Sequence, residues 1–117
     1  MVNDSEVKER IEHHLIRNKE LLRVIQRKGF CIDDARLIEC HFWSPSETEA
    51  ENLSTELRKR SFTQLRLNES DGGVWNLEMT VRQSASSTAS KEFTTEMTMT
   101  AARFDSVYDG WGTLLSD

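Results

Sequence analysis

The side chains that most often bind metals or act as nucleophiles are few in this sequence of 117 residues. It holds three histidines and two cysteines: His13, His14, His41, Cys31 and Cys40. Neighbouring histidines on a helix point about 100° apart, so the first two do not form an i,i+4 metal pair. The sequence contains no Cys-x-x-Cys or His-Glu-x-x-His motif, and no serine lies in a nucleophile elbow. We therefore expect no metal, no cofactor and no catalytic residue, and both cysteines as free thiols.

A segment rich in glycine and aromatic residues near the C-terminus is the most distinctive stretch of the chain. It reads Tyr108-Asp109-Gly110-Trp111-Gly112. Glycines on both sides of a tryptophan predict a sharp structural turn or a close approach to another surface. A large aromatic side chain on such a turn either fills a core or contacts a partner, and burial is the commoner outcome. Asp109 is expected to cap the turn through its own backbone.

The length and composition suit one soluble globular domain spanning residues 1–117. Hydrophobic residues make up 37% of the chain and charged residues 30%, which excludes a disordered or membrane-embedded class. No apolar run approaches the roughly 18–20 residues that span a bilayer. The first residues lack the basic and apolar regions of a signal peptide. We expect a cytoplasmic protein without membrane contacts.

The net charge of −5 is unevenly distributed along the chain. The first 30 residues carry seven basic and five acidic side chains, a balance of +2, so the remainder carries −7. Such a body repels phosphate backbones, so direct nucleic-acid binding is not expected. Trp43 and Trp75 could stack on bases, but the charge argues against that function.

The first half of the chain predicts a helix, a strand and a second helix. Apolar residues at helical spacing indicate a helix within residues 1–29, capped by Asp4 or Ser5 and closed by Gly29. Two-residue alternation over 36–43 indicates a strand. A capping box from Ser44 to Glu47 then starts a helix that runs to about residue 60.

The second half predicts a hairpin, a helix and a short last strand. Segments 62–69 and 75–82 alternate as strands around the turn-forming residues 68–73. Segment 91–103 fits both a strand and a helix, and we choose the helix because a polar capping loop precedes it. Segment 105–109 is then a strand that leads into the Gly-Trp-Gly turn.

The order of elements after the first helix is β-α-β-β-α-β. This order predicts an α+β fold of the ferredoxin-like sandwich type over residues 35–113, with a four-stranded antiparallel sheet and helices on one face. The N-terminal helix, within residues 1–29, must bury its apolar stripe at a sheet edge or on a partner.

The run Tyr108-Asp-Gly-Trp-Gly-Thr113 resembles the C-terminal signature of the ribonuclease E inhibitor family, the regulators of ribonuclease activity of type B. Lys28-Gly29 followed by acids, and then Arg36-Leu-Ile-Glu-Cys-His41, resemble the first helix and strand of the same family. The resemblance spans roughly residues 15–113. It implies a bacterial α+β domain of this family.

The resemblance also implies a function. It predicts a non-enzymatic regulator that binds and inhibits an endoribonuclease of the ribonuclease E type, with the acidic domain docked on a basic, RNA-contacting region of the enzyme. A general protein-interaction domain with an unrelated partner is the alternative, and the motif would then serve the fold alone. A small hydrolase is a third class, but the glycine-rich phosphate loop of acylphosphatases has no match here. The candidate partner-binding residues are Tyr108, Asp109, Trp111, His41 and Glu39.

Overall fold

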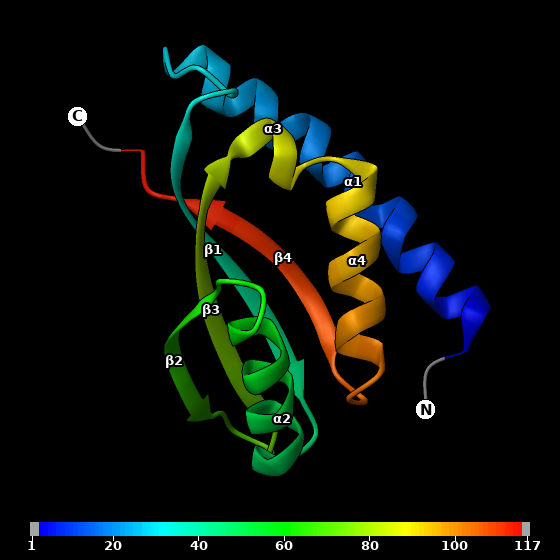
Figure 1. Cartoon of the computed structure of the whole chain (residues 1–117). Helices are drawn as coiled ribbons and strands as arrows, with labels where there is room; N and C mark the ends of the chain where they lie inside the picture. The colour runs from blue at the N-terminus through cyan, green and yellow to red at the C-terminus, as the bar shows by residue number, and fades with distance from the viewer. Residues whose placement is uncertain (1–2, 116–117) are drawn as a thin grey trace.

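The computed structural model describes residues 3–115 and has an α+β architecture (Figure 1). Four strands form one sheet, and a long N-terminal helix precedes them. In chain order the elements are α1 (Asp4–Arg27), β1 (Ala35–Ser44), α2 (Glu47–Arg58), β2 (Thr63–Glu69), β3 (Trp75–Ser84), α3 (Ala85–Thr88), α4 (Lys91–Ala102) and β4 (Val107–Thr113).

The sheet has the strand order β2-β3-β1-β4, and each neighbouring pair is antiparallel. The predicted hairpin of β2 and β3 is confirmed, and Gly72 and Gly73 in its turn have positive φ. In the centre of the sheet, His41 on β1 lies opposite Glu78 on β3 and Gly110 on β4. These registers decide which side chains share a face.

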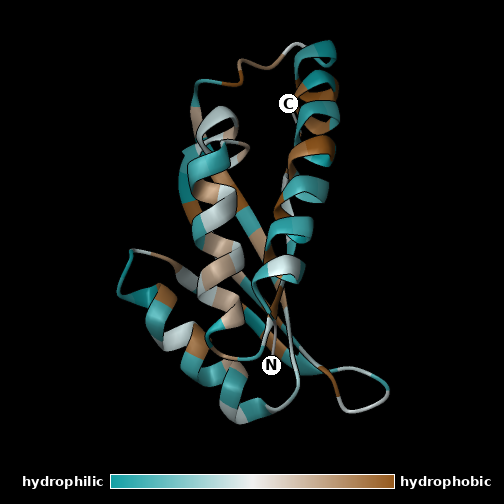
Figure 2. Ribbon diagram, turned by 90° about the vertical axis from the view of Figure 1, so that its right-hand side faces the viewer, coloured by the Kyte–Doolittle hydropathy of each residue, from teal (hydrophilic) through white to brown (hydrophobic). Residues whose placement is uncertain are grey.

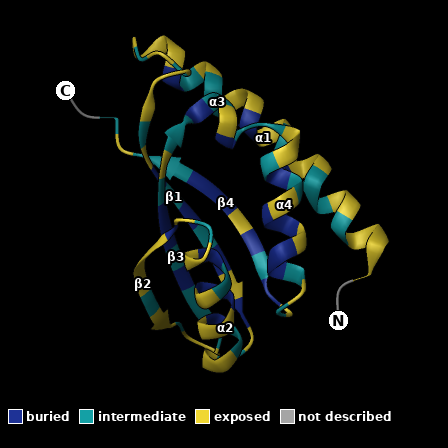
Figure 3. Cartoon of the chain, in the orientation of Figure 1, coloured by how far each residue is buried: buried dark blue, intermediate teal, exposed yellow. Residues whose placement is uncertain are grey.

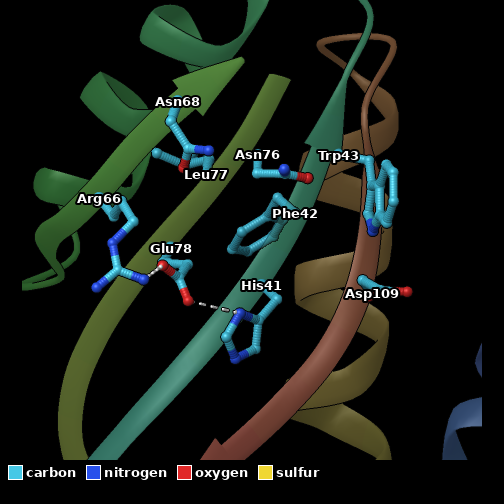
Figure 4. A pocket seen from close by; sticks show the side chains of 9 residues that line it. All are labelled: His41, Phe42, Trp43, Arg66, Asn68, Asn76, Leu77, Glu78 and Asp109. Atoms are coloured by element: carbon cyan, nitrogen blue, oxygen red, sulfur yellow. Dashed lines mark hydrogen bonds and ion pairs between the residues drawn. The ribbon is translucent and has the colours of Figure 1, made fainter. Parts of the chain in front are cut away.

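One face of the sheet is buried and the other is open. On β1, Ile38, Cys40 and Phe42 are buried, while Leu37 and Trp43 on the opposite face are exposed. Helix α2 packs over β1, β2 and β3, and α4 packs on β4 (Figure 3). In Figure 4 the sheet is seen from its open face, with the helices behind the strands. The predicted alternation along β1 is confirmed.

Helix α1 begins at a polar cap and packs on α4 and β4. The Asn3 side chain accepts a hydrogen bond from the Glu6 backbone N–H, so the cap is Asn3 and the prediction of Asp4 or Ser5 was wrong by one or two residues. Gly29, with φ of +89°, follows the helix end as expected. Hydrophilic and hydrophobic residues alternate along α1, as one packed face requires (Figure 2). The apolar stripe of the helix is half-buried along most of its length and fully buried at Ile25.

Two local predictions need correction between β1 and α4. The cap of α2 is Ser46, whose side chain accepts from the Glu49 N–H at 3.2 Å, whereas Ser44 ends β1 and its hydroxyl lies 2.7 Å from that of Ser106. The polar loop before α4 contains a further short helix, α3. The choice of a helix over residues 91–103 is confirmed by α4.

The Gly-Trp-Gly segment is a strand and not the expected sharp turn. Strand β4 continues through it and pairs with β1, with a bulge at Asp109 between the pairs Phe42–Tyr108 and His41–Gly110. Gly110 takes φ of +117° at this bulge. Cross-strand pairing with β1 outweighs the turn tendency of glycine here, because it buries Trp111 in the core.

Candidate functional site

A hollow of about 310 Å³ lies on the open face of the sheet (Figure 4). Strands β1, β2 and β3 supply most of the residues that border it, and β4 adds one from the bulge. The residues around it are His41, Phe42, Trp43, Arg66, Asn68, Asn76, Leu77, Glu78 and Asp109.

A charged row crosses three strands beside the hollow. Arg66 and His41 lie opposite Glu78, from β2 and β1 respectively. Arg66 Nη1 donates to Glu78 Oε2 at 2.9 Å, and His41 Nδ1 lies 3.3 Å from Glu78 Oε1. The Glu78 side chain is only 17% exposed, so its carboxylate lies partly buried between Arg66 and His41.

Glu39 joins His41 and Glu78 in a group of three potential metal ligands. Glu39 lies two residues before His41 and therefore projects from the same face of β1. One ligand atom from each of the three side chains lies within 4.8 Å of the others. Within residues 3–115 this is the one such group found. Sequence motifs missed it because the third ligand comes from another strand, 37 positions after His41.

Trp43 is the most prominent aromatic side chain on this face. It is 44% exposed and borders both the first hollow and a second one of about 400 Å³. Asp109 borders both hollows too, and Asp105 borders the second. From the sequence alone, base stacking was the one role assigned to Trp43, and the charge of the chain argued against it. Its place on the open face of β1 was readable from the alternation of the strand.

Tyr108 and Trp111 point away from this surface into the core. Tyr108 is 2% exposed and Trp111 is 8% exposed. The ring centroid of Tyr108 lies 4.9 Å from that of His14 and 5.3 Å from that of Phe42. The five candidate residues are thus divided: two aromatic rings lie inside, Asp109 is exposed, and Glu39 and His41 are half-buried on the open face.

Three polar side chains of α1 bind β4. His14 Nε2 donates to the backbone oxygen of Tyr108 at 2.9 Å, and Arg17 Nη1 donates to that of Asp109 at 3.4 Å. Asn18 Oδ1 accepts from Trp111 Nε1 at 2.9 Å. Burial lowers the pKa of His14, the hydrogen bond to Tyr108 opposing this in part. A neutral His14 ring with its proton on Nε2 fits this contact. The three hydrogen bonds hold α1 against β4, which is an edge strand of the sheet, and so protect that edge.

Cys40 and Tyr108 face each other inside the core. Burial raises the pKa of Cys40 to about 12, and burial together with the neighbouring thiol raises the pKa of Tyr108. Among the described residues the Tyr108 hydroxyl finds no well-formed hydrogen bond. Both groups stay protonated at neutral pH, so neither supplies a nucleophile.

Comparison with known protein families identifies the family of this chain. Residues 15–113 match the family model of RraB, described as regulator of ribonuclease activity B. The chain belongs to the RraB family. The match runs from within α1 to the last residue of β4, and the family name implies regulation of ribonuclease activity. A search of curated proteins found no match for the chain. Across residues 3–115, the helices are too short or too polar to cross a membrane.

The glycines of the signature give the RraB domain a bare strip beside the ligand group. Gly110 and Gly112 lie opposite His41 and Glu39 in the β1–β4 pair, so β4 adds no side chain next to them. A Cβ added at Gly112 would meet nothing within 4 Å. Trp111, which lies between the two glycines, points into the core. The signature of residues 108–112 therefore contributes to the interior and also leaves the surface at Gly112 open.

Proposed function

We propose that this RraB protein is a non-enzymatic regulator that binds an endoribonuclease of the ribonuclease E type through the open face of its sheet and inhibits it by protein contact. Family membership supports the class of function. The observation that carries the proposal is Trp43, which is half-exposed between two hollows and supports the open face of the sheet as the binding surface.

Trp43 has the properties of an interface anchor. Tryptophan is among the residues that most often dominate binding energy, and it does so when a partner covers it completely. Here the ring is 44% exposed, and hollows on both sides leave room for side chains of a partner. A partner that filled both hollows would enclose the indole.

The charges around Trp43 favour a basic partner segment. The two charged residues that border the second hollow, Asp105 and Asp109, are both acidic. An arginine or lysine placed between these carboxylates and the indole face would gain ion pairing and a cation–π contact. The basic, RNA-contacting part of a ribonuclease has this chemistry. Binding of this kind weakens as salt is added.

The other candidate residues take part in two ways. Glu39, His41 and Asp109 contact the partner directly from the open face. Tyr108 and Trp111 act from the core, where they hold β4 in the position that presents Asp109.

The same proposal covers the domain and its setting. Residues 1–117 act as one RraB-like domain, with the N-terminal helix in 1–29 and a ferredoxin-like sandwich in 35–113. Two β-α-β units and the strand order β2-β3-β1-β4 support that fold class. The protein works in the cytoplasm, and contacts protein rather than nucleic acid or membrane.

Cleavage of an RNA substrate by the ribonuclease E-type enzyme of the same organism tests the function. The full-length protein is expected to slow cleavage, and binding measured by calorimetry is expected to weaken between low and high salt. Trp43→Ala and Asp109→Asn should each weaken binding, and an interface anchor typically costs about 2 kcal/mol or more. Ile16→Ala is the matched control, because Ile16 is 70% exposed on α1, a different element.

Two results would overturn parts of this assignment. If the wild-type protein neither binds the enzyme nor slows cleavage, the alternative holds, namely a general interaction domain with an unrelated partner. If it binds and both variants bind as tightly as Ile16→Ala, the partner uses another surface. Circular dichroism of each variant separates lost binding from lost folding.

A further inference from the structure

We propose that Glu39, His41 and Glu78 form a binding site for a divalent transition-metal ion of the zinc class. Two ligands come from one face of β1 and the third from the opposite position on β3. The inference concerns the geometry of this group alone and does not depend on the proposed ribonuclease partner.

The spacing of the ligand atoms fits a bound ion. Zinc binds histidine nitrogen and carboxylate oxygen at about 2.0–2.2 Å, so neighbouring ligand atoms in a tetrahedral site lie about 3.3 Å apart. His41 Nδ1 and Glu78 Oε1 are 3.3 Å apart. The remaining distances, from Glu39 to each of these two residues, are within 4.8 Å, which a rotation of the half-buried Glu39 side chain can shorten.

Arg66 holds one ligand in place without using its free oxygen. It donates to Oε2 of Glu78 at 2.9 Å, whereas Oε1 is the oxygen that faces His41. Carboxylates that ligate metals are themselves commonly hydrogen-bonded by outer partners, which fix their orientation. The Arg66 charge also offsets part of the repulsion between the two glutamates, so the group can persist before an ion binds.

The site has space for further ligands. The strand on its other side presents Gly112 opposite Glu39, where an added Cβ would meet open space, whereas Gly110 is buried next to the Arg17 guanidinium. Three protein ligands with an open fourth position are the arrangement found when zinc keeps water or an external donor. One imidazole with two carboxylates favours zinc or cobalt over calcium or magnesium, which prefer oxygen alone.

Titration of the full-length, metal-free protein with Co²⁺ and Zn²⁺ tests the proposal. We expect one Co²⁺ per chain with the visible absorption bands of a four- or five-coordinate ion, displaced by Zn²⁺. In His41→Ala and Glu78→Gln the affinity should fall by more than the roughly 10- to 100-fold that outer-shell changes cost. Zn²⁺ should raise the Tm of the wild type and not that of His41→Ala.

Matched controls separate this site from adventitious binding. His13→Ala removes an exposed histidine of α1, and Cys31→Ser removes the exposed thiol; both variants should bind Co²⁺ like the wild type. Absence of Co²⁺ binding by the wild type would refute the site, and so would unchanged binding in both His41→Ala and Glu78→Gln. Loss of binding in either control would place the ion elsewhere and refute it as well.

Discussion

The indole nitrogen of Trp111 lies 2.9 Å from the side-chain oxygen of Asn18, which joins β4 to α1 across 93 positions of the chain. The amide nitrogen of Asn18 donates to Thr94 Oγ1 at 3.1 Å and to the backbone oxygen of Ala89 at 3.3 Å. Asn18 is 5% exposed. One buried amide therefore connects α1, α4 and the strand that carries the family signature.

Trp111→Phe tests this connection. The substitution keeps an aromatic ring but leaves the Asn18 oxygen buried without its donor, which costs about 1–3 kcal/mol. Urea unfolding followed by circular dichroism measures the loss. Trp43→Phe is the control, because Trp43 is 44% exposed and its substitution should change stability by less than about 0.5 kcal/mol. Equal stability of the two variants would mean that the Asn18 bond contributes nothing net.

Tyr108→Phe should have the opposite sign from Trp111→Phe, although both positions belong to the same motif. The Tyr108 hydroxyl is buried without a well-formed hydrogen bond, so removing it relieves a desolvation cost. We expect unfolding free energy to stay unchanged or rise by about 1 kcal/mol in the same urea assay. A loss above that size would show that the hydroxyl does find a partner, with the Cys40 thiol as the first candidate.

His14 should make stability depend on pH below neutrality. Burial lowers its pKa in the folded protein below the ordinary value of about 6.5, which the unfolded chain keeps. Between the two pKa values the unfolded state binds more protons, so stability is full above about pH 6.5 and falls as pH drops through the lowered pKa.

The variant His14→Gln isolates this contribution. Glutamine has an N–H that can still donate toward the Tyr108 backbone oxygen but does not titrate. Its unfolding free energy should therefore vary less between pH 7 and pH 5 than that of the wild type, as measured by urea titrations. The exposed neighbour His13→Gln should keep the wild-type dependence. If His14→Gln keeps it too, carboxylates and not His14 cause the acid sensitivity.

Periodicity predicted best the elements that have a single buried face, such as β1, whereas β2 buries no residue fully and was predicted from its turn as much as from its pattern. The alternation at Ile38, Cys40 and Phe42 sufficed for β1, since the pattern of a strand is set by neighbours two residues away. Helix α4 was ambiguous on pattern, and its capping loop decided it correctly: Ser90 accepts from the Phe93 N–H at 3.1 Å.

Features that depend on distant partners were not readable in the same way. The motif around Trp111 looked like a turn, because nothing local shows that β1 will pair with it. The contact of His41 with Glu78 depends on the register of two strands, and the bond from Trp111 to Asn18 depends on where α1 packs. Such sites require three-dimensional contacts, whereas exposed Trp43 could have been identified from strand alternation alone.

The two glycines of the signature should respond differently to alanine. Gly110 has φ of +117° at the bulge, where a Cβ is strained and would also lie 3.4 Å from the Arg17 guanidinium, so Gly110→Ala should cost about 1–3 kcal/mol.

Gly112 does not have a positive φ of this kind and has open space around it. Alanine in a strand interior is favoured over glycine by roughly 0.5–1 kcal/mol. Gly112→Ala should therefore fold at least as stably as the wild type in urea unfolding. A large loss at Gly112 would instead mean that its backbone is constrained. If stability holds while a bulkier Gly112→Leu weakens Co²⁺ or partner binding, the glycine is there for the open surface beside Glu39 and not for the fold.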